Sequence, residues 1–297
     1  MTRYDRLMAR VARGEKILID GATGTEIEKR GVPQLDNAWN GGGALSHPEV
    51  LRAVHEDYIR EGAEIVISNT FATHRRALID AGAENDFEAL NRDSVALAIE
   101  ARNRTGAADV LVAGGISYWS WSGDWMAPEE IRTDAERQAA IMAAAGADLL
   151  MLEMMSDIAE TIVTLEAALT AGLPVWVGLS CKFGSDGAPQ LLRSGALSDA
   201  MEALQGYDIP LISIMHTEVE DVTACLDAVK QTWAGPLGVY AHSARWEGQV
   251  GIFDQTIPPL AYADYAKGWL DNGVQIIGGC CGLGVDHIRS LKPLVSE

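Results

Sequence analysis

Residues 133–180 have the sequence TDAERQAAIMAAAGADLLMLEMMSDIAETIVTLEAALTAGLPVWVGLS. Two stretches, 133–145 and 157–171, have the apolar spacing of helices, and a glycine follows each of them. The runs after these glycines, Asp148–Glu153 and Pro174–Ser180, are short and almost wholly apolar. Such runs are typical of parallel strands that are buried on both faces. The stretch therefore predicts two helix–strand units of an α/β protein with a parallel sheet.

The same unit recurs along the whole chain. Further apolar runs lie at Lys16–Asp20, Glu64–Asn69, Val110–Ala113, Pro210–Ile214, Pro236–Tyr240 and Gln275–Gly278, and further helical stretches at Pro48–Glu61, Asp93–Arg104 and Ser198–Gln205. Roughly eight strands in a chain of this length predict a single (β/α)8 TIM barrel domain over residues 1–297. A doubly wound open sheet is the alternative. It is disfavoured because the first turn, residues 21–25, carries no GxGxxG and no acidic ribose partner follows a second strand.

Composition excludes several classes of protein. Hydrophobic residues make up 48% and charged residues 22%, as in globular proteins. A net charge of −19 argues against a nucleic-acid or anionic-membrane partner, because the field of the protein repels phosphate. No apolar run approaches the ~20 residues of a membrane span, and no signal peptide is visible. Four cysteines do not form a disulfide scaffold, so we expect a cytoplasmic protein with free thiols.

Chemically active side chains gather at the predicted carboxyl ends of the strands, where barrel enzymes place their catalysis. These residues are Asp20, Asn69, Thr70, Glu153, Cys181, His216, Tyr240, His242, Cys280 and Cys281. Glycines flank the two adjacent cysteines and permit the sharp turn that two ligands of one ion require. Two thiolates and one imidazole suit Zn²⁺ and leave a fourth position open, which is typical of a catalytic site. A pair of buried hydrophobic cysteines, or a vicinal disulfide, is the alternative.

Aromatic residues concentrate in one predicted mouth loop. The segment Ser117–Trp125 holds Trp119, Trp121 and Trp125, and tryptophan is the best cation–π partner for a cationic ligand. Packing within the loop, or a subunit interface, would explain these aromatics equally well. Trp39, followed by Asn40 and three glycines, predicts a lid with an aromatic tip.

Three segments resemble the homocysteine S-methyltransferase family. They are residues 17–31 (ILIDGATGTEIEKRG), residues 54–70 (VHEDYIREGAEIVISNT) and residues 276–282 (IIGGCCG), and the resemblance runs from about residue 16 to residue 292. It implies a zinc-dependent (β/α)8 barrel that transfers a methyl group from a sulfonium or quaternary ammonium donor to a small thiol. The expected acceptor is homocysteine and the expected product is methionine, so the resemblance also implies a role in methionine biosynthesis.

The resemblance also implies roles for single residues. His216, Cys280 and Cys281 would hold Zn²⁺ and, with Glu153, form the catalytic set. Asp20 and Glu153 would hold the amino group of the acceptor. Asn69, Thr70, Trp39, Trp119 and Trp121 would complete the substrate site. For Asp20, a helix N-cap or a loop hydrogen bond is the alternative. A thiol with a pKa of about 8.5 is a poor nucleophile near neutral pH, and zinc coordination would remove its proton.

The chain departs from the family pattern at several strand ends. The family's first zinc ligand is a cysteine after the sixth strand, where this chain has His216. A neutral imidazole makes the centre less negative and the bound thiolate less nucleophilic, which favours a different acceptor or a metal-bound water. Met154 and the pair Ala241-His242 also differ from the usual residues, and Ala72 counts against betaine as donor.

Several functions therefore remain open. One is a zinc hydrolase or lyase on the same barrel that uses a metal-bound water. Methyl transfer to an acceptor other than homocysteine is another, and a redox or metal sensor based on Cys280 and Cys281 is a third. Cys225 is expected in the core and His287 on a surface helix. The donor stays unidentified, and an assembly of identical chains is compatible with the sequence.

Overall fold

The computed structural model describes residues 1–247, 250–253 and 255–296. Its centre is one sheet of eight parallel strands in the order β1-β12-β9-β8-β5-β4-β3-β2. These strands are β1 (Ile17–Leu18), β2 (Ile65–Ile67), β3 (Leu111–Ile116), β4 (Leu149–Met155), β5 (Val175–Leu179), β8 (Ile212–Glu218), β9 (Leu237–His242) and β12 (Ile276–Ile277). A parallel bridge between Ile19 and Ile65 joins the first strand to the last in this order. The (β/α)8 barrel is confirmed, and the open doubly wound sheet is excluded.

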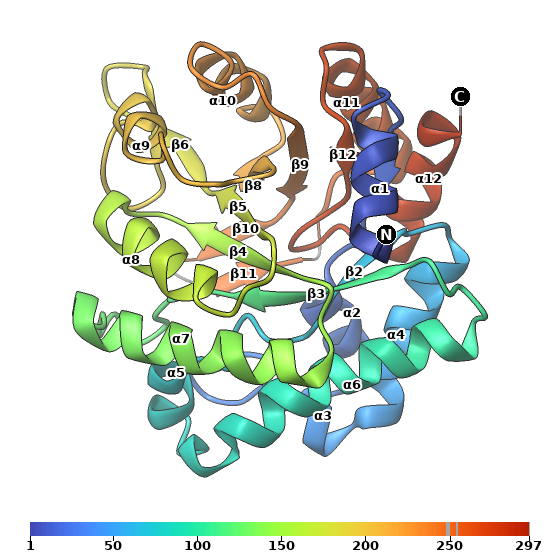
Figure 1. Ribbon diagram of the computed structural model, residues 1–297, viewed down its shortest axis with the longest axis vertical. Helices are drawn as coiled ribbons and strands as arrows, with labels where there is room; N and C mark the ends of the chain where they lie inside the picture. Colours follow the sequence, from blue (N-terminus) through green and yellow to red (C-terminus); the bar gives the residue numbers. More distant parts are fainter. Residues whose placement is uncertain (248–249, 254, 297) are drawn as a thin grey trace.

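Helices surround the sheet (Figure 1). They are α1 (Arg3–Val11), α2 (Thr23–Lys29), α3 (Gly43–Ser46), α4 (Pro48–Arg60), α5 (Arg75–Asp80), the 3-10 helix η1 (Glu84–Asp86), α6 (Phe87–Arg104), α7 (Pro128–Ala145), α8 (Ile158–Leu169), α9 (Leu197–Ala203), α10 (Val222–Val229), α11 (Pro259–Asp271) and α12 (Val285–Val295). Two antiparallel hairpins, β6 (Cys181–Phe183) with β7 (Pro189–Leu191) and β10 (Arg245–Glu247) with β11 (Val250–Ile252), follow β5 and β9. In the described part of the chain, no helix has the length and apolarity that a membrane span needs.

Side chains alternate between the interior of the barrel and the layer under the helices. Along β1 and β2, for example, Ile17 and Ile65 belong to the inner cluster, whereas Leu18 and Val66 belong to the outer one. Helix α1 closes the amino-terminal end, because its Leu7 and Val11 join the inner cluster. Trp176 also lies there and donates its indole N–H to the Tyr4 hydroxyl at 3.0 Å. The opposite end of the barrel is left for the functional site.

Two strands break this alternation with a bulge. Between Leu152 and Met155, β4 has one residue more than the facing segment of β5, and β8 has one more than β9 between Met215 and Glu218. The extra residues take positive φ angles, 59° at Met154 and 43° at His216. Each bulge lets two consecutive side chains face the barrel mouth, which regular alternation forbids. This places the His216 side chain at the mouth beside that of Met215.

Two expectations about single residues outside the site have different outcomes. Cys225 lies in the core on α10, as expected. The expectation that His287 lies on the surface is wrong, because only 7% of it is exposed. Its ring packs edge-on against Tyr262, and its Nε2 lies 2.7 Å from the Ile257 carbonyl oxygen. The apolar face of α12 turns toward the barrel, and His287 lies on that face.

Candidate active site

A cavity of about 770 Å³ opens at the carboxyl ends of the strands. Strand ends contribute Glu153, Met154, Met215, His216, Tyr240, His242, Cys280 and Cys281 to its wall, and loops add residues 21–24, residues 34–37 and 39–41, and Trp119 and Trp121. The site therefore lies where the barrel fold predicts it. Most of the residues that the sequence singled out meet in this one space.

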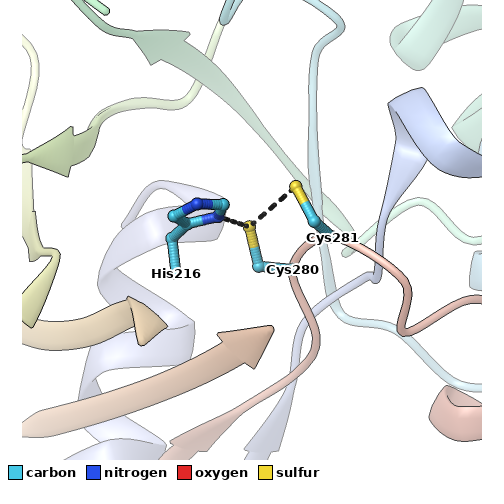
Figure 2. Close-up of side chains that lie close together, drawn as sticks. All are labelled: His216, Cys280 and Cys281. Carbon is cyan, nitrogen blue, oxygen red and sulfur yellow. Dashed lines mark hydrogen bonds between the residues drawn. The ribbon is translucent and has the colours of Figure 1, made fainter. Parts of the chain in front are cut away.

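His216, Cys280 and Cys281, which all line this cavity, point toward one another (Figure 2). The Cys280 Sγ lies 3.6 Å from the His216 Nδ1 and 3.9 Å from the Cys281 Sγ, and all three potential ligand atoms lie within 4.8 Å of one another. A tetrahedral zinc ion with Zn–S bonds of about 2.3 Å needs sulfur atoms about 3.8 Å apart, and sulfur about 3.5 Å from nitrogen. The two distances from the Cys280 Sγ fit these values, and the third pair of atoms lies within 4.8 Å, so the three side chains are close enough to hold one metal ion.

Backbone hydrogen bonds fix the turn that carries the two cysteines. Cys280 N–H donates to the Ala241 carbonyl at 2.7 Å, and Gly279 N–H donates to the Asp20 carbonyl at 3.1 Å. A side chain at Gly278 would begin 2.2 Å from Ile19 Cγ1, so the turn can pass β1 only with glycine there. The glycines that flank the cysteines thus allow the pair to lie close to the neighbouring strands.

The surroundings of His216 and Cys280 shift the pKa values of both side chains. Burial and the neighbouring His242 hold the pKa of His216 well below its usual range, so the imidazole stays neutral, as metal binding requires. The hydrogen bond with Cys281, together with burial, raises the pKa of Cys280 well above its ordinary value. As a thiolate, the partly buried Cys280 sulfur would need a positive partner. A metal cation would supply that partner.

Glu153 and Asp20 are both buried, but they lie differently. Glu153 lines the cavity, and burial raises its pKa to about 8. Asp20 is not part of the cavity wall; its carboxylate accepts a hydrogen bond from Ile67 N–H at 2.8 Å. Burial raises the pKa of Asp20 well above its usual range, and the nearby Glu153 raises it further. Asp20 is therefore buried outside the cavity wall, close enough to Glu153 for the two carboxyl groups to interact.

Asn69 and Thr70 also differ in whether they line the cavity. Asn69 lines the cavity and donates from Nδ2 to the Asn40 carbonyl at 2.8 Å. Thr70 is fully buried outside the wall, and its hydroxyl donates to the Gly115 carbonyl at 2.7 Å. Thr70 thus ties the end of β2 to β3. Only Asn69 of this pair faces the space where a substrate would lie.

Trp39, Trp119 and Trp121 all line the cavity, together with Phe71. Phe71 and Trp121 pack edge to face with their ring centroids 5.8 Å apart. Trp119 packs in the same way against Trp125, at 5.3 Å. The loop aromatics therefore pack against one another, as one interpretation of the sequence expects, and Trp119 and Trp121 also line the cavity.

The structure adds residues to which the sequence assigned no role. The Tyr240 hydroxyl is buried in the cavity wall without a hydrogen-bond partner in the described part of the chain. His242 lies beside His216, and its Nε2 is 3.0 Å from Oε1 of Glu218. Tyr240 and His242 were visible as strand-end residues. Glu218 could have been found only from the bulge, because it follows His216 by two residues in a strand whose alternation is broken.

Comparison with known proteins agrees with this geometry. The family model described as homocysteine S-methyltransferase matches residues 17–295. A homocysteine S-methyltransferase of Escherichia coli (strain K12) is 29% identical over 98% of this chain and 99% of its own length. A selenocysteine methyltransferase of Astragalus bisulcatus is 24% identical over 96% of this chain and 94% of its own. The match therefore covers nearly the whole chain.

A solved structure has the same overall fold. It is the homocysteine methyltransferase MmuM from Escherichia coli in its metallated form, which aligns with a TM-score of 0.79. The sequence identity is 27%, and the alignment covers 96% of this chain and 98% of that chain.

Proposed function

Since this chain belongs to the homocysteine S-methyltransferase family, we propose that it is a zinc-dependent enzyme that moves a methyl group from a sulfonium or quaternary ammonium donor to homocysteine, giving methionine. The convergence of His216, Cys280 and Cys281 within 4.8 Å, at the wall of a cavity that Glu153 and three tryptophans also line, carries this proposal. These groups match the needs of the reaction: ligands for a metal, a carboxylate for an ammonium group and aromatic faces for an onium ion.

Zinc is the metal that this set of ligands fits best. Two cysteine sulfurs and one imidazole form a borderline-soft set, and three protein ligands leave one position open. Bound there, Zn²⁺ would act as a Lewis acid that lowers the pKa of the acceptor thiol. The contribution of the protein is to hold three ligands in a fixed geometry and to leave one side accessible from the cavity.

Glu153 is suited to bind the amino group of the acceptor. Its carboxyl group is buried, lines the cavity and has a pKa of about 8 because of that burial. An ammonium group placed against it would compensate the buried charge and favour the ionised form. Asp20 lies outside the cavity wall, and the nearby Glu153 is one cause of its raised pKa, so the two carboxyl groups are linked electrostatically.

The aromatic part of the cavity lining is suited to a cationic methyl donor. Trp39, Trp119 and Trp121 present aromatic faces, and an onium ion within about 6 Å of a ring centroid is attracted to it. Four carboxylates line the cavity, at Asp36, Glu153, Glu218 and Asp221, against the cations Lys182 and Arg193. The guanidinium of Arg193 is engaged with Glu160 and the Trp125 ring. A donor that arrives charged and leaves neutral is compatible with this acidic lining.

A panel of donors and acceptors tests the proposed function. The purified zinc-loaded protein is mixed with homocysteine and, in separate reactions, with methylated sulfonium and quaternary ammonium compounds, and mass spectrometry measures methionine. We expect methionine to form with at least one donor. Breakdown of a donor in a reaction that contains no thiol would instead indicate a hydrolase or lyase. The absence of methionine with every donor would contradict the proposal.

A further inference from the structure

His242, at the end of β9, packs against His216 on the neighbouring strand β8. The two ring centroids lie 4.3 Å apart, with an angle of 53° between the ring planes. Both side chains line the cavity, and each residue is only 5% exposed. A ring at this distance limits the rotation of its neighbour, so His242 bounds the space in which the His216 imidazole can turn.

Glu218 in turn holds His242. The His242 Nε2 lies 3.0 Å from the Glu218 Oε1, and the two residues are paired in the register of β8 and β9. With its hydrogen on Nε2, the imidazole donates to the carboxylate, and this bond fixes the plane of the ring. Only 6% of the His242 side chain is exposed, against 45% of the Glu218 side chain.

His216 needs such support more than a ligand in a regular strand would. Its backbone has a φ of 43°, in the left-handed region, at the bulge of β8. The alternation of the strand therefore does not decide where its side chain points. The imidazole must also present one particular nitrogen to the metal, whereas a thiolate can bind from several orientations.

We propose that His242, held by Glu218, is a positioning residue that keeps the His216 imidazole turned toward Cys280 and Cys281 for metal binding. This inference rests on the proposed metal site. It assigns a function to two residues that do not themselves belong to the set of ligands, and it connects β8 and β9 through one chain of contacts from the carboxylate to the metal site. Groups that orient metal ligands in this way typically contribute about 10- to 100-fold to metal affinity.

The inference is tested by the zinc affinity of single variants. This affinity is measured on the full chain by competition with a chromogenic chelator. We expect His242→Ala and Glu218→Ala to weaken zinc binding about 10-fold or more. Glu218→Gln keeps an oxygen that can accept the same hydrogen bond, so it should retain most of the affinity. Glu220→Ala is the matched control, because it removes an exposed carboxylate two residues away. Thermal melting shows that each variant is folded, and Glu218 is exposed enough for its removal to leave the fold intact.

A double-mutant cycle separates positioning from a general structural effect. In a His216→Cys background no imidazole needs orienting, so His242→Ala should cost much less zinc affinity there than in the wild type. Cobalt(II) absorption gives an independent readout, since its ligand-field bands should shift in His242→Ala.

Two results would overturn the inference: wild-type zinc affinity in both His242→Ala and Glu218→Ala, or equal losses in the two backgrounds. If the wild type binds no zinc, the proposed function itself fails.

Discussion

Glu153 places a carboxyl group at the site, but it does so in a buried position that disfavours the charged form. Its carboxyl group is buried, and burial raises its pKa from 4.5 to about 8. In the unfolded chain the same group ionises at its ordinary pKa. The folded protein therefore holds the proton over a pH range in which the unfolded chain has lost it. A group of this kind lowers stability in exchange for its placement at the site.

The pKa of Glu153 is higher in the folded protein than in the unfolded chain, so we predict that stability depends on pH. Between about pH 5 and about pH 8 the unfolded state releases the proton while the folded state keeps it, so the free energy of unfolding should fall as the pH rises. Each pH unit between the two pKa values is worth about 1.4 kcal/mol at most. Glu153→Gln removes this effect and should lose less stability over the same range, as measured by chemical denaturation of the metal-free protein.

Glu49→Gln serves as the control for this prediction. Glu49 is an exposed glutamate at the start of α4, so its removal should leave the pH dependence unchanged. A Glu153→Gln variant whose stability follows the same pH dependence as the wild type would contradict the burial of the carboxyl group.

At the scale of elements, the space beside Glu153 is set by β3. A side chain at Gly115 would begin 2.3 Å from the Glu153 Oε2, so the absence of a side chain there makes room for the carboxylate. We predict that Gly115→Ala displaces this flexible carboxylate and lowers kcat/KM for homocysteine about 10-fold or more, because small misplacements at a site are costly. Thermal stability should change little. An unchanged kcat/KM would show that this position of Glu153 is not needed.

Gly268→Ala is the matched comparison for Gly115→Ala, because we expect it to change stability and not activity. Gly268 is exposed within α11, and a side chain there would meet no atom within 4 Å. Glycine in a helix interior costs roughly 0.5–1 kcal/mol relative to alanine. Gly268→Ala should therefore raise the melting temperature and leave activity unchanged. A lower melting temperature would contradict the exposed helical position.

The elements of the barrel were predictable because of where they are buried. Strands covered on both faces are continuous apolar runs, so each of the eight was visible in the sequence and is confirmed. The convergence of His216, Cys280 and Cys281 followed from the rule that strand ends meet at one mouth. These features depend on local pattern and on a general property of the fold.

Other features depend on contacts that no local pattern encodes. The bulges that turn Met154 and His216 toward the mouth arise from the pairing register between strands. Asp20 and Thr70 lie at predicted strand ends, yet hydrogen bonds to Ile67 and Gly115 turn both away from the cavity. The expected surface position of His287 failed for a related reason, since only the packing of α12 decides which of its faces is buried.

In the molecule as a whole, the metal site joins two strands, β8 and β12, that are separated by one strand, β9, in the barrel order. His216 belongs to β8, and the two cysteines follow β12 near the point where the chain closes on β1. An ion bound only by the folded protein stabilises it through mass action. We therefore predict that a chelator lowers the melting temperature and that added zinc restores it. Cys280→Ser should melt at the same temperature with and without the chelator, whereas equal effects on both proteins would contradict the assignment.

X-ray absorption at the zinc edge is the sharpest test of the proposed zinc site, because it identifies the atoms around the bound ion. For the purified zinc-loaded protein we predict two sulfur neighbours at about 2.3 Å and the outer-shell signal of one imidazole. His216→Ala should lose the imidazole signal and Cys280→Ser one sulfur. A protein that binds no zinc, or zinc surrounded only by oxygen and nitrogen, would contradict the account.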